Sequence, residues 1–572
     1  MSLGRWTKQA LLLVVVVWLA AAARYRVHGE GGGAWGNTVN GDGHGYHGML
    51  VGLFLHGNPA AAPIRAGFFT PAGQGHAIKY TCGAPLMQAP FFLLAHGIAF
   101  LRGTSDPTGL SIEYQLGSLV GAITWSLFGL LLIARIGSRA GIADPVIAFT
   151  LVLIALGTGL MYYAIITPAM AHAYGFAAVS WCCFEAQRVW QQRKGALPRL
   201  AFALALAVLV RPTLVLIVPM LAVVAVLAQG RWQHLANARS IVQAALAGLA
   251  VLMLQPLLWK LQSGAWLVDG YASEGFNWRD PRMWSVLFGA RKGFFFYWPA
   301  LLLLLPALAW ALWRRPRPMM PVLLGLLAMA YVTSAWWNWY YGHGYGMRAL
   351  VDVLPVCALL IMAWFAAIGS QARNVAMLCA SPLIALQLFQ SWQHEKGILH
   401  PFNMDREKYA LSFLRTDTRI GQRFGNGYIA ELYAPHGWDT VASVSLSADS
   451  TLHLSGSWQH TPALRLSGDR LPAGRELYAN FEFSRRSIDP FASDSAFVVF
   501  TYSTEGIQRM HETFAMNDIR GLDDTQWRQW RHAFNMPKAE AGEEVAIYLW
   551  QPGHGRIELR DLRVTLRAVR NQ

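Results

Sequence analysis

A short segment near the N-terminus combines one carboxylate with glycines, histidines and a tyrosine. It spans residues 37–47, reads Asn-Thr-Val-Asn-Gly-Asp-Gly-His-Gly-Tyr-His, and is followed by another glycine. So much glycine weakens a buried core unless the backbone needs unusual angles or a close approach. The segment therefore predicts either a solvated connector or a functional loop whose chemistry centres on Asp42.

Five cations lie in or beside polar and aromatic segments between hydrophobic runs: Lys79, Arg211, Arg291, Lys292 and Arg348. A charge at membrane depth costs roughly 2.5 kcal/mol or more unless it is paired or hydrated. One such residue after a span is explained by snorkelling to lipid headgroups. Several of them in glycine- and aromatic-rich loops instead favour a cavity that receives an anion.

Histidines near Asp42 raise the alternative of a metal site. His44, His47 and the more distant His76 could bind a divalent cation with Asp42, although their spacing fits no specific template. The chain has five cysteines, four of them in apolar runs and none after Cys379. Neither a disulfide framework nor a cysteine-based metal site is predicted.

The composition is that of a polytopic membrane protein. The 572 residues are 54% hydrophobic and 14% charged, with a mean hydropathy of +0.30, whereas a soluble protein has roughly a quarter charged residues. The hydrophobic runs are close to the ~20 residues that span a bilayer. The net charge of +15 is concentrated in short loops and the tail. Basic short loops are typical of cytoplasmic ends of spans, so nucleic-acid binding is excluded.

The first apolar run, 10–23, follows two basic residues and could be a signal peptide or a first transmembrane helix. Either alternative places the next loop, 24–114, outside. Ten further spans are predicted near 115–135, 145–163, 168–187, 199–210, 213–229, 241–262, 294–313, 318–335, 349–369 and 374–391.

The run 84–101 decides the topology. It is apolar but contains Pro85 and Pro90. If it does not cross, the basic loops all lie in the cytoplasm; if it does, they all lie outside. We therefore predict a re-entrant segment, a hairpin of two short helices over 199–229, and eleven crossings with the N-terminus inside. The long polar loops then share the outer face, where function is expected.

The sequence after residue 391 has a different pattern. Residues 1–391 form the predicted transmembrane domain, 392–440 a linker with a short helix near 404–414, and 441–572 a domain of alternating strands. Short strands between glycine and proline turns predict an all-β sandwich of jelly-roll type. Its tryptophans, Trp458, Trp527, Trp530 and Trp550, favour core positions, with stacking on sugar rings as the alternative.

Several motifs of the first 391 residues resemble those of bacterial membrane glycosyltransferases of the GT-C superfamily. Gly289–Pro299 resembles their S-x-x-G-hydrophobic-x-x-Y-x-P turn, and Tyr341–Pro355 is similar to their GG-x-S-x-G-x-R-x-L-x-D-x-x-P stretch. Lys79–Phe92, Pro168–Tyr174 and Arg211–Thr213 match in order and spacing. Within this superfamily, the chain resembles in type the aminoarabinose transferases and the protein O-mannosyl transferases. The resemblance does not extend to the tail.

The resemblance implies a sugar donor linked to polyprenyl phosphate and transfer to a glycan, lipid or protein at the outer face. The expected location is the bacterial inner membrane, with several crossings and the active site and sandwich in the periplasm.

Because a lipid phosphate is a good leaving group, one carboxylate could suffice as base, unlike the two needed for glycoside hydrolysis. Cations would hold the phosphate. The assigned roles are Asp42 as base or base-orienter; Lys79, Arg211, Arg291, Lys292 and Arg348 as phosphate ligands; and Tyr46, His172, Tyr174 and Tyr345 as substrate-positioning residues.

Two features depart from the family pattern. Gly-His-Gly-Tyr replaces Gly-Gly-x-Ser, and the first loop has one acid where many relatives have two neighbouring acids. The competing hypothesis is a transporter or flippase of lipid-linked glycans. Such proteins often show two related halves with broken helices, and no such symmetry is present here. Eleven crossings also exceed what a membrane anchor for a binding sandwich would need.

Overall fold

The computed structural model divides the chain into two compact units. Unit 1 comprises Met1–Ala272, Arg282–Ser334 and Tyr345–Ser391, and unit 2 comprises Ser273–Pro281, Ala335–Gly344 and Trp392–Gln572. The structure describes residues 3–569 except 28–36, 105, 228–236, 272–273, 425–437, 446–450, 456–458, 462, 468–469, 473, 476, 506, 518, 522, 537–539 and 541.

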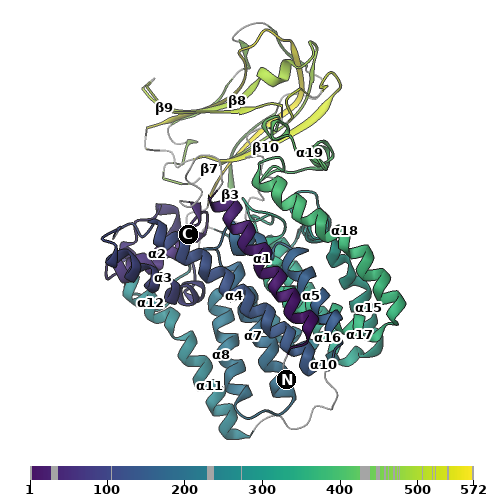
Figure 1. Ribbon diagram of the computed structural model, residues 1–572. Helices are drawn as coiled ribbons and strands as arrows, with labels where there is room; N and C mark the ends of the chain where they lie inside the picture. Colours follow the sequence, from purple (N-terminus) through teal and green to yellow (C-terminus); the bar gives the residue numbers. More distant parts are fainter. Residues whose placement is uncertain are drawn as a thin grey trace. The chain divides into compact units, whose positions relative to one another are not determined.

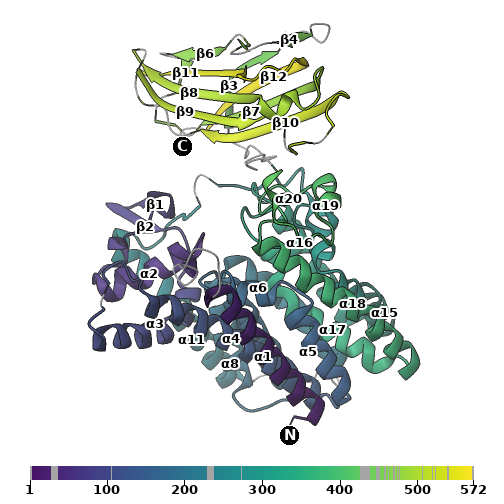
Figure 2. The same ribbon diagram turned by 45° about the horizontal axis from the view of Figure 1, so that its top comes forward.

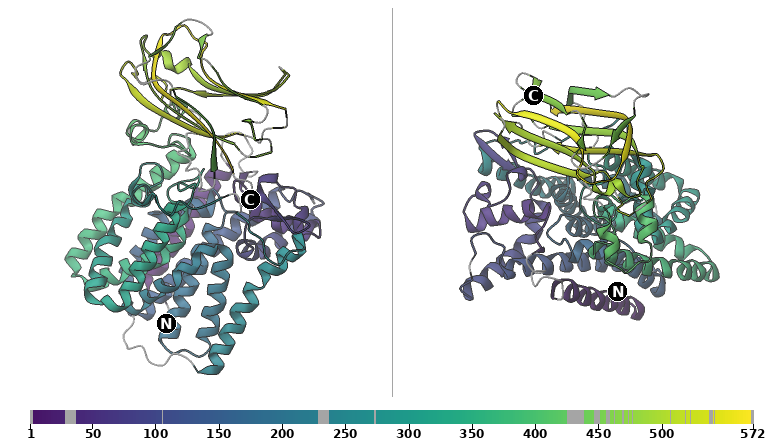
Figure 3. Two further views of the ribbon diagram at one scale, coloured as in Figure 1. Left: turned by 180° about the vertical axis from the view of Figure 1, so that it is seen from behind. Right: turned by 90° about the horizontal axis from the view of Figure 1, so that it is seen from above.

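Unit 1 is a bundle of apolar helices that run side by side (Figures 1 and 3). Seven of the described helical segments are long and apolar enough to cross a membrane, which makes the chain a multi-pass membrane protein. The main helices are α1 Arg5–Val27, α3 Gly83–Leu101, α4 Ile112–Arg139, α5 Asp144–Leu156, α7 His172–Trp190, α8 Ala196–Val210, α11 Ala238–Leu252, α12 Leu254–Ser263, α15 Leu304–Arg314, α16 Pro316–Ala335, α17 Leu354–Ala367 and α18 Ser370–Glu395.

Some predicted spans consist of short helical pieces. These pieces are α6 Leu160–Ile165, η4 Pro212–Leu216, α9 Ile217–Met220, η5 Leu221–Val223, α10 Val224–Leu227, α13 Met283–Phe288, α14 Phe294–Tyr297, η6 Pro299–Leu303 and η7 Arg348–Val353. Glycine and proline explain several breaks, because Gly157 follows α5 and a proline begins η4 and η6. Proline has no N–H to donate and suits the first turn of a helix.

The sequence predicted a re-entrant segment over residues 84–101, but the prolines do not interrupt the helix there. These residues form the continuous helix α3, with Pro90 inside it, and this helix is long and apolar enough for a span. Polar contacts tie it to its neighbours: the Trp125 indole donates to the carbonyl of Met87 at 2.8 Å, and the Gln88 amide donates to Ala169 O at 3.0 Å. Such packing tolerates a proline in an apolar helix.

The glycine-rich segment is also more ordered than a connector. Its second half begins helix α2, Gly43–Leu55, with Asp42 at the N-cap position. Gly45 is needed for packing, because a Cβ there would lie 2.4 Å from the ring of Tyr80. After α2 come η2 Pro59–Ala61, η3 Ala66–Phe68 and the antiparallel hairpin of β1 Phe69–Ala72 and β2 Gly75–Ile78.

Unit 2 contains the predicted antiparallel β-sandwich (Figure 2). One sheet has the order β10-β7-β12-β3 with β4 beside β12, and the other has the order β5-β11-β8-β9 with β6 beside β11. The strands are β3 Trp438–Ser445, β4 Leu452–Leu454, β5 Gln459–His460, β6 Leu464–Ser467, β7 Leu477–Ser487, β8 Phe497–Thr504, β9 Ile507–Ala515, β10 Arg528–Met536, β11 Glu544–Gln551 and β12 Ile557–Val569. The short elements are α19 Arg406–Ser412, α20 Arg419–Gln422 and η9 Ala492–Ser495.

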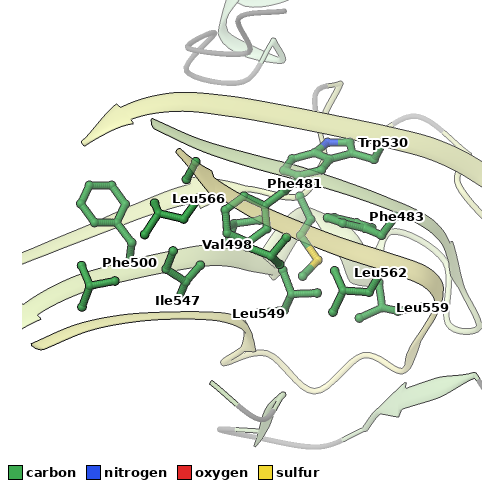
Figure 4. Packing of buried hydrophobic residues seen from close by; sticks show 14 of the residues in the cluster. Phe481, Phe483, Val498, Phe500, Trp530, Ile547, Leu549, Leu559, Leu562 and Leu566 are labelled. Carbon is green, nitrogen blue, oxygen red and sulfur yellow. The ribbon is translucent and has the colours of Figure 1, made fainter. Parts of the chain in front are cut away.

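Alternating residues of the two sheets form the sandwich core (Figure 4). Trp530 is buried there against Phe483, with ring centroids 4.5 Å apart. Trp527 is half-buried, and the guanidinium groups of Arg486 and Arg560 lie over its ring at 5.0 and 4.1 Å. The core prediction is therefore confirmed for Trp530 and wrong for Trp527. Trp550 is half-buried, and Trp458 lies outside the described residues.

Candidate active site

Asp42 accepts contacts from two distant parts of unit 1. The Arg348 guanidinium lies 2.8 Å from Asp42 Oδ2, and the Tyr80 hydroxyl donates to Oδ1 at 2.9 Å. The Asp42 side chain nevertheless keeps 37% of its surface exposed, against 12% for Arg348. The carboxylate is thus fixed in orientation and still open to an incoming molecule.

The surroundings keep Asp42 ionised. Burial by itself would raise the pKa of this carboxyl, but the charge of Arg348, the Tyr80 hydrogen bond and the charge of Lys79 outweigh burial and hold the pKa below its usual 3.8. Burial and the nearby Asp42 charge raise the pKa of Tyr80 well above its usual range. Tyr80 therefore remains a hydrogen-bond donor at neutral pH.

Aromatic rings surround this carboxylate and a lysine beside it. Tyr46 stacks on Tyr80 with ring centroids 4.6 Å apart. The Lys79 ammonium lies 5.5 Å from the centroid of Tyr80 and 5.7 Å from that of Tyr271, within range of cation–π attraction. The segment that carries Tyr271 packs closely against Lys79, the residue after strand β2, since a Cβ on Gly270 would lie 2.4 Å from Lys79 O.

A second ion pair lies close to the first. Arg211 follows α8 in an extended conformation, and its Nη1 donates to Asp352 Oδ2 at 2.6 Å and to Ala349 O at 3.2 Å. Asp352 is fully buried and its Oδ1 lies 3.9 Å from His172 Nδ1. Since Arg348 and Asp352 are both in η7, this short helix supplies one member of each pair.

The charges of both ion pairs, Asp42 with Arg348 and Asp352 with Arg211, act on the hydroxyl of Tyr46. Burial, together with the charges of Asp42 and Asp352, raises the pKa of its hydroxyl above the usual range, while Arg211 and Arg348 act in the opposite direction. All four charged groups are therefore near one tyrosine. The structure brings together Asp42, Lys79, Arg211, Arg348, Tyr46 and His172, as the sequence predicted, although their chemistry stays a proposal.

Lys292 is supplied by the turn between α13 and α14. The turn is closed by the Tyr297 hydroxyl, which donates to Ala290 O at 2.7 Å, and by the Gly293 amide, which donates to Gly289 O at 2.7 Å. Lys292 is buried at 2% exposure. Burial, then the charges of Arg291 and Arg348, hold the pKa of its ammonium well below the usual value. Lys292 and Arg291 thus lie near Arg348, and the lowered pKa disfavours the charged form of Lys292.

Two of the predicted substrate-positioning residues pack into the protein instead. Tyr345 is fully buried, and its hydroxyl donates to Gln387 O at 3.3 Å and to Tyr297 O at 3.4 Å. Tyr174 is fully buried in an apolar cluster. Neither side chain has surface to offer a substrate, because both fill space between helices.

The histidines near Asp42 do not assemble with it into a metal site. His47 is buried, and its Nε2 lies 2.7 Å from Gly109 O; burial lowers its pKa to about 4. His44 is close to Gly41 O and stacks on Phe68. Within the described part of the chain, no three His, Cys, Asp or Glu side chains are grouped so that they could hold a metal ion.

Sequence reasoning did not assign Tyr80 or Asp352 to the site. Tyr80 is adjacent to Lys79, and Asp352 is four residues after Arg348, so proximity to a candidate cation was the available signal. Asp352 is a second acid in this region, and it pairs with Arg211. Chemically, the site combines an exposed, ionised carboxylate with several cations, which suits an anionic ligand and a proton transfer.

No model of a known protein family matches the chain, and no curated protein matches its sequence. Solved structures do resemble it. ArnT from Cupriavidus metallidurans in the apo state gives a TM-score of 0.42 at 15% identity, over 72% of this chain and 67% of that chain. Archaeal oligosaccharyltransferase AglB from Archaeoglobus fulgidus, in complex with an inhibitory peptide and a dolichol-phosphate, gives a TM-score of 0.40 at 14% identity. This match covers 75% of this chain and 60% of that chain. Both are GT-C glycosyltransferases, the superfamily that the motifs resemble.

Proposed function

We propose that this chain is an integral membrane glycosyltransferase that moves a sugar from a polyprenyl-phosphate-linked donor to a hydroxyl acceptor. One observation carries the proposal: Asp42 is held by Arg348 and Tyr80 but keeps 37% of its side-chain surface exposed. A carboxylate that served stability alone would gain nothing from that exposure. The cations around it match a phosphate-bearing donor.

The leaving group explains why one acid can suffice. When the bond between the sugar and the lipid phosphate breaks, the phosphate leaves with an additional negative charge and needs no proton. Cations that contact its oxygens stabilise this charge as it develops. In our proposal Arg348 donates to the phosphate oxygens on which this charge develops, whereas Arg211 holds the phosphate equally before and during transfer. Lys79 acts as a point charge, and the phosphate offsets the burial that disfavours the charged form of Lys292.

Asp42 acts on the acceptor. Its lowered pKa makes it a weak base toward a free alcohol, but the acceptor hydroxyl becomes acidic as its oxygen bonds to the sugar carbon. The carboxylate then accepts the proton during bond formation. Before that step it orients the hydroxyl by accepting its hydrogen bond, while Tyr80 and Arg348 hold the carboxylate in place.

The donor implies a particular cellular setting. A polyprenyl chain lies in the bilayer, so its phosphate is at the membrane surface, where the loops that carry Asp42, Lys79 and Arg211 would meet it. If α3 does not cross the bilayer, the alternation of basic loops along the sequence supports the outer side of the bacterial inner membrane for these segments. The acceptor is then a glycan, a lipid or a protein in the periplasm.

The test uses the purified full-length chain in liposomes with a polyprenyl-phosphate sugar that carries a radiolabel on the sugar. We expect label to move to a hydroxyl acceptor and unlabelled polyprenyl phosphate to accumulate. Label that crosses the bilayer still attached to its lipid would instead identify a flippase and refute the transferase.

A further inference from the structure

Asp352 is a buried carboxylate with capacity to accept further hydrogen bonds. One oxygen accepts from Arg211 at 2.6 Å. The other oxygen, Oδ1, has no hydrogen-bond partner among the described residues, and the same holds for His172 Nδ1, which is 3.9 Å away. Space for this carboxylate exists because residue 175 is glycine; a Cβ there would lie 2.4 Å from Oδ1.

Arg211 is fixed at one end of its guanidinium. Nη1 contacts both Asp352 and Ala349 O, and 16% of the side chain remains exposed. Because a guanidinium is planar and rigid, fixing one nitrogen also fixes the directions of the other N–H groups. A carboxylate at this position thus sets the direction in which Arg211 can donate to a ligand.

The charges of the four paired groups cancel. Asp42 with Arg348, and Asp352 with Arg211, sum to zero, so these pairs attract an anion weakly by net charge. Recognition of a phosphate by Arg211 must then depend on the direction of its hydrogen bonds. Such charge-assisted bonds are strong when their geometry is right.

We propose that Asp352 is a positioning residue that directs the Arg211 guanidinium toward the phosphate of the lipid-linked donor. This inference rests on the proposed transferase function. Because Arg211 contacts the phosphate before and during transfer, losing its orientation weakens ground-state and transition-state binding equally. The expected consequence is a higher KM for the donor with kcat nearly unchanged.

The experiment compares Asp352→Asn, Arg211→Ala and the double variant in the full-length protein. Two quantities are measured: the Kd for farnesyl phosphate, a short polyprenyl monophosphate, and the KM and kcat for sugar transfer. We expect Asp352→Asn to raise Kd and KM about tenfold, the loss of one charge-assisted hydrogen bond, and to have no further effect when Arg211 is already alanine. Asp144→Asn is the control, since Asp144 binds the start of α1 through Trp6 and Thr7.

Other results would overturn the inference. Tighter binding by Asp352→Asn would show that Asp352 only neutralises Arg211, and additive effects in the double variant would show a purely structural role. Absence of farnesyl phosphate binding by the unmodified protein would also refute it. If the unmodified protein binds this probe but transfers no sugar, the transferase proposal fails separately. Should Asp352→Asn not fold, Gly175→Ala displaces the same carboxylate while keeping its charge, and the same rise in Kd is expected.

Discussion

The two units each contain buried carboxylate–arginine chemistry, but they use it differently. In the sandwich, Asp524 is 1% exposed and Arg485 4%. Asp524 accepts from Arg485 at 3.2 Å, from the Ser487 hydroxyl at 2.5 Å, from the Ser493 hydroxyl, and from the Phe491 amide at 3.3 Å. Both oxygens of this carboxylate therefore accept hydrogen bonds within the protein.

The candidate site leaves its carboxylates incomplete. Asp42 has two contacts and 37% exposure, and Asp352 Oδ1 has no partner among the described residues. A buried polar group without a partner lowers stability, so such an arrangement is expected where a ligand completes the bonding. The comparison separates a carboxylate that stabilises a fold from carboxylates that are prepared for a ligand.

The largest predicted effect tests whether Arg348, the partner of Asp42, serves ligand binding and not only the stability of the fold. Arg348→Ala removes a hydrogen-bond donor from Asp42 and, in our proposal, from the phosphate. We expect kcat/KM for sugar transfer to fall by about 10²–10³-fold. Arg102→Ala is the control, because Arg102 also pairs with a carboxylate, Glu113 at 2.9 Å, but is 60% exposed. Equal losses in the two variants would contradict a special role for Arg348.

Asp524→Asn tests the other side of the comparison. Removing one charge of a buried pair destabilises a protein by about 3–5 kcal/mol. We therefore expect a clearly lower melting temperature, which is measured by the fluorescence of the sandwich tryptophans. The folded protein should keep its specific transfer activity. An unchanged melting temperature together with lost activity would reverse the assignment of the two networks.

Tyr80→Phe gives a smaller effect at the site. The change removes the hydroxyl that donates to Asp42 and keeps the ring that stacks on Tyr46. Losing a hydrogen bond to a charged group corresponds to roughly tenfold in kcat/KM. Tyr548→Phe, at a half-buried tyrosine of β11, serves as the control. Activity equal to that of the unmodified protein would show that Tyr80 does not orient the carboxylate.

The smallest effect concerns pH. Because the folded-state pKa of Asp42 lies below 3.8, its ionised form and the stability from its pairing persist as pH falls, and are lost only as pH falls through that lowered pKa. Protonation of Asp42 should therefore not reduce kcat/KM between about pH 7 and pH 5. In Tyr80→Phe the acid limb should move to higher pH, because a bond to the charged form is lost. A limb unchanged in that variant would exclude Asp42 as its origin.

Hydropathy and alternation predicted the architecture because they report burial directly. Apolar runs became helices of unit 1, and period-two segments became strands of the sandwich. The helix α2 was missed for a physical reason. Glycine disfavours an isolated helix, but here packing decides: Gly45 lets Tyr80 approach the helix closely, and this same approach delivers the Tyr80 hydroxyl to Asp42.

The pairing of charges could not be predicted from spacing. Arg348 and Asp352 are four residues apart, a spacing that in an α-helix favours contact between them. They lie instead in the 3-10 helix η7 and pair with Asp42 and Arg211 from distant segments. The same limit explains Tyr345: its glycine-rich surroundings predicted a loop near substrate, but only the tertiary structure shows that Tyr163, Tyr297 and Gln387 enclose it.

One measurement tests the central claim most directly: single-turnover transfer of radiolabelled sugar from its polyprenyl-phosphate donor by purified Asp42→Asn. Asparagine keeps the shape of the side chain but cannot take up the acceptor's proton. Asp106→Asn is measured in parallel, since Asp106 lies in the same N-terminal region and accepts hydrogen bonds from Thr108 and Leu110 of its own turn. We expect Asp42→Asn to lose about 10²–10⁴-fold in rate while Asp106→Asn stays near the unmodified rate. Full transfer by Asp42→Asn would contradict the account.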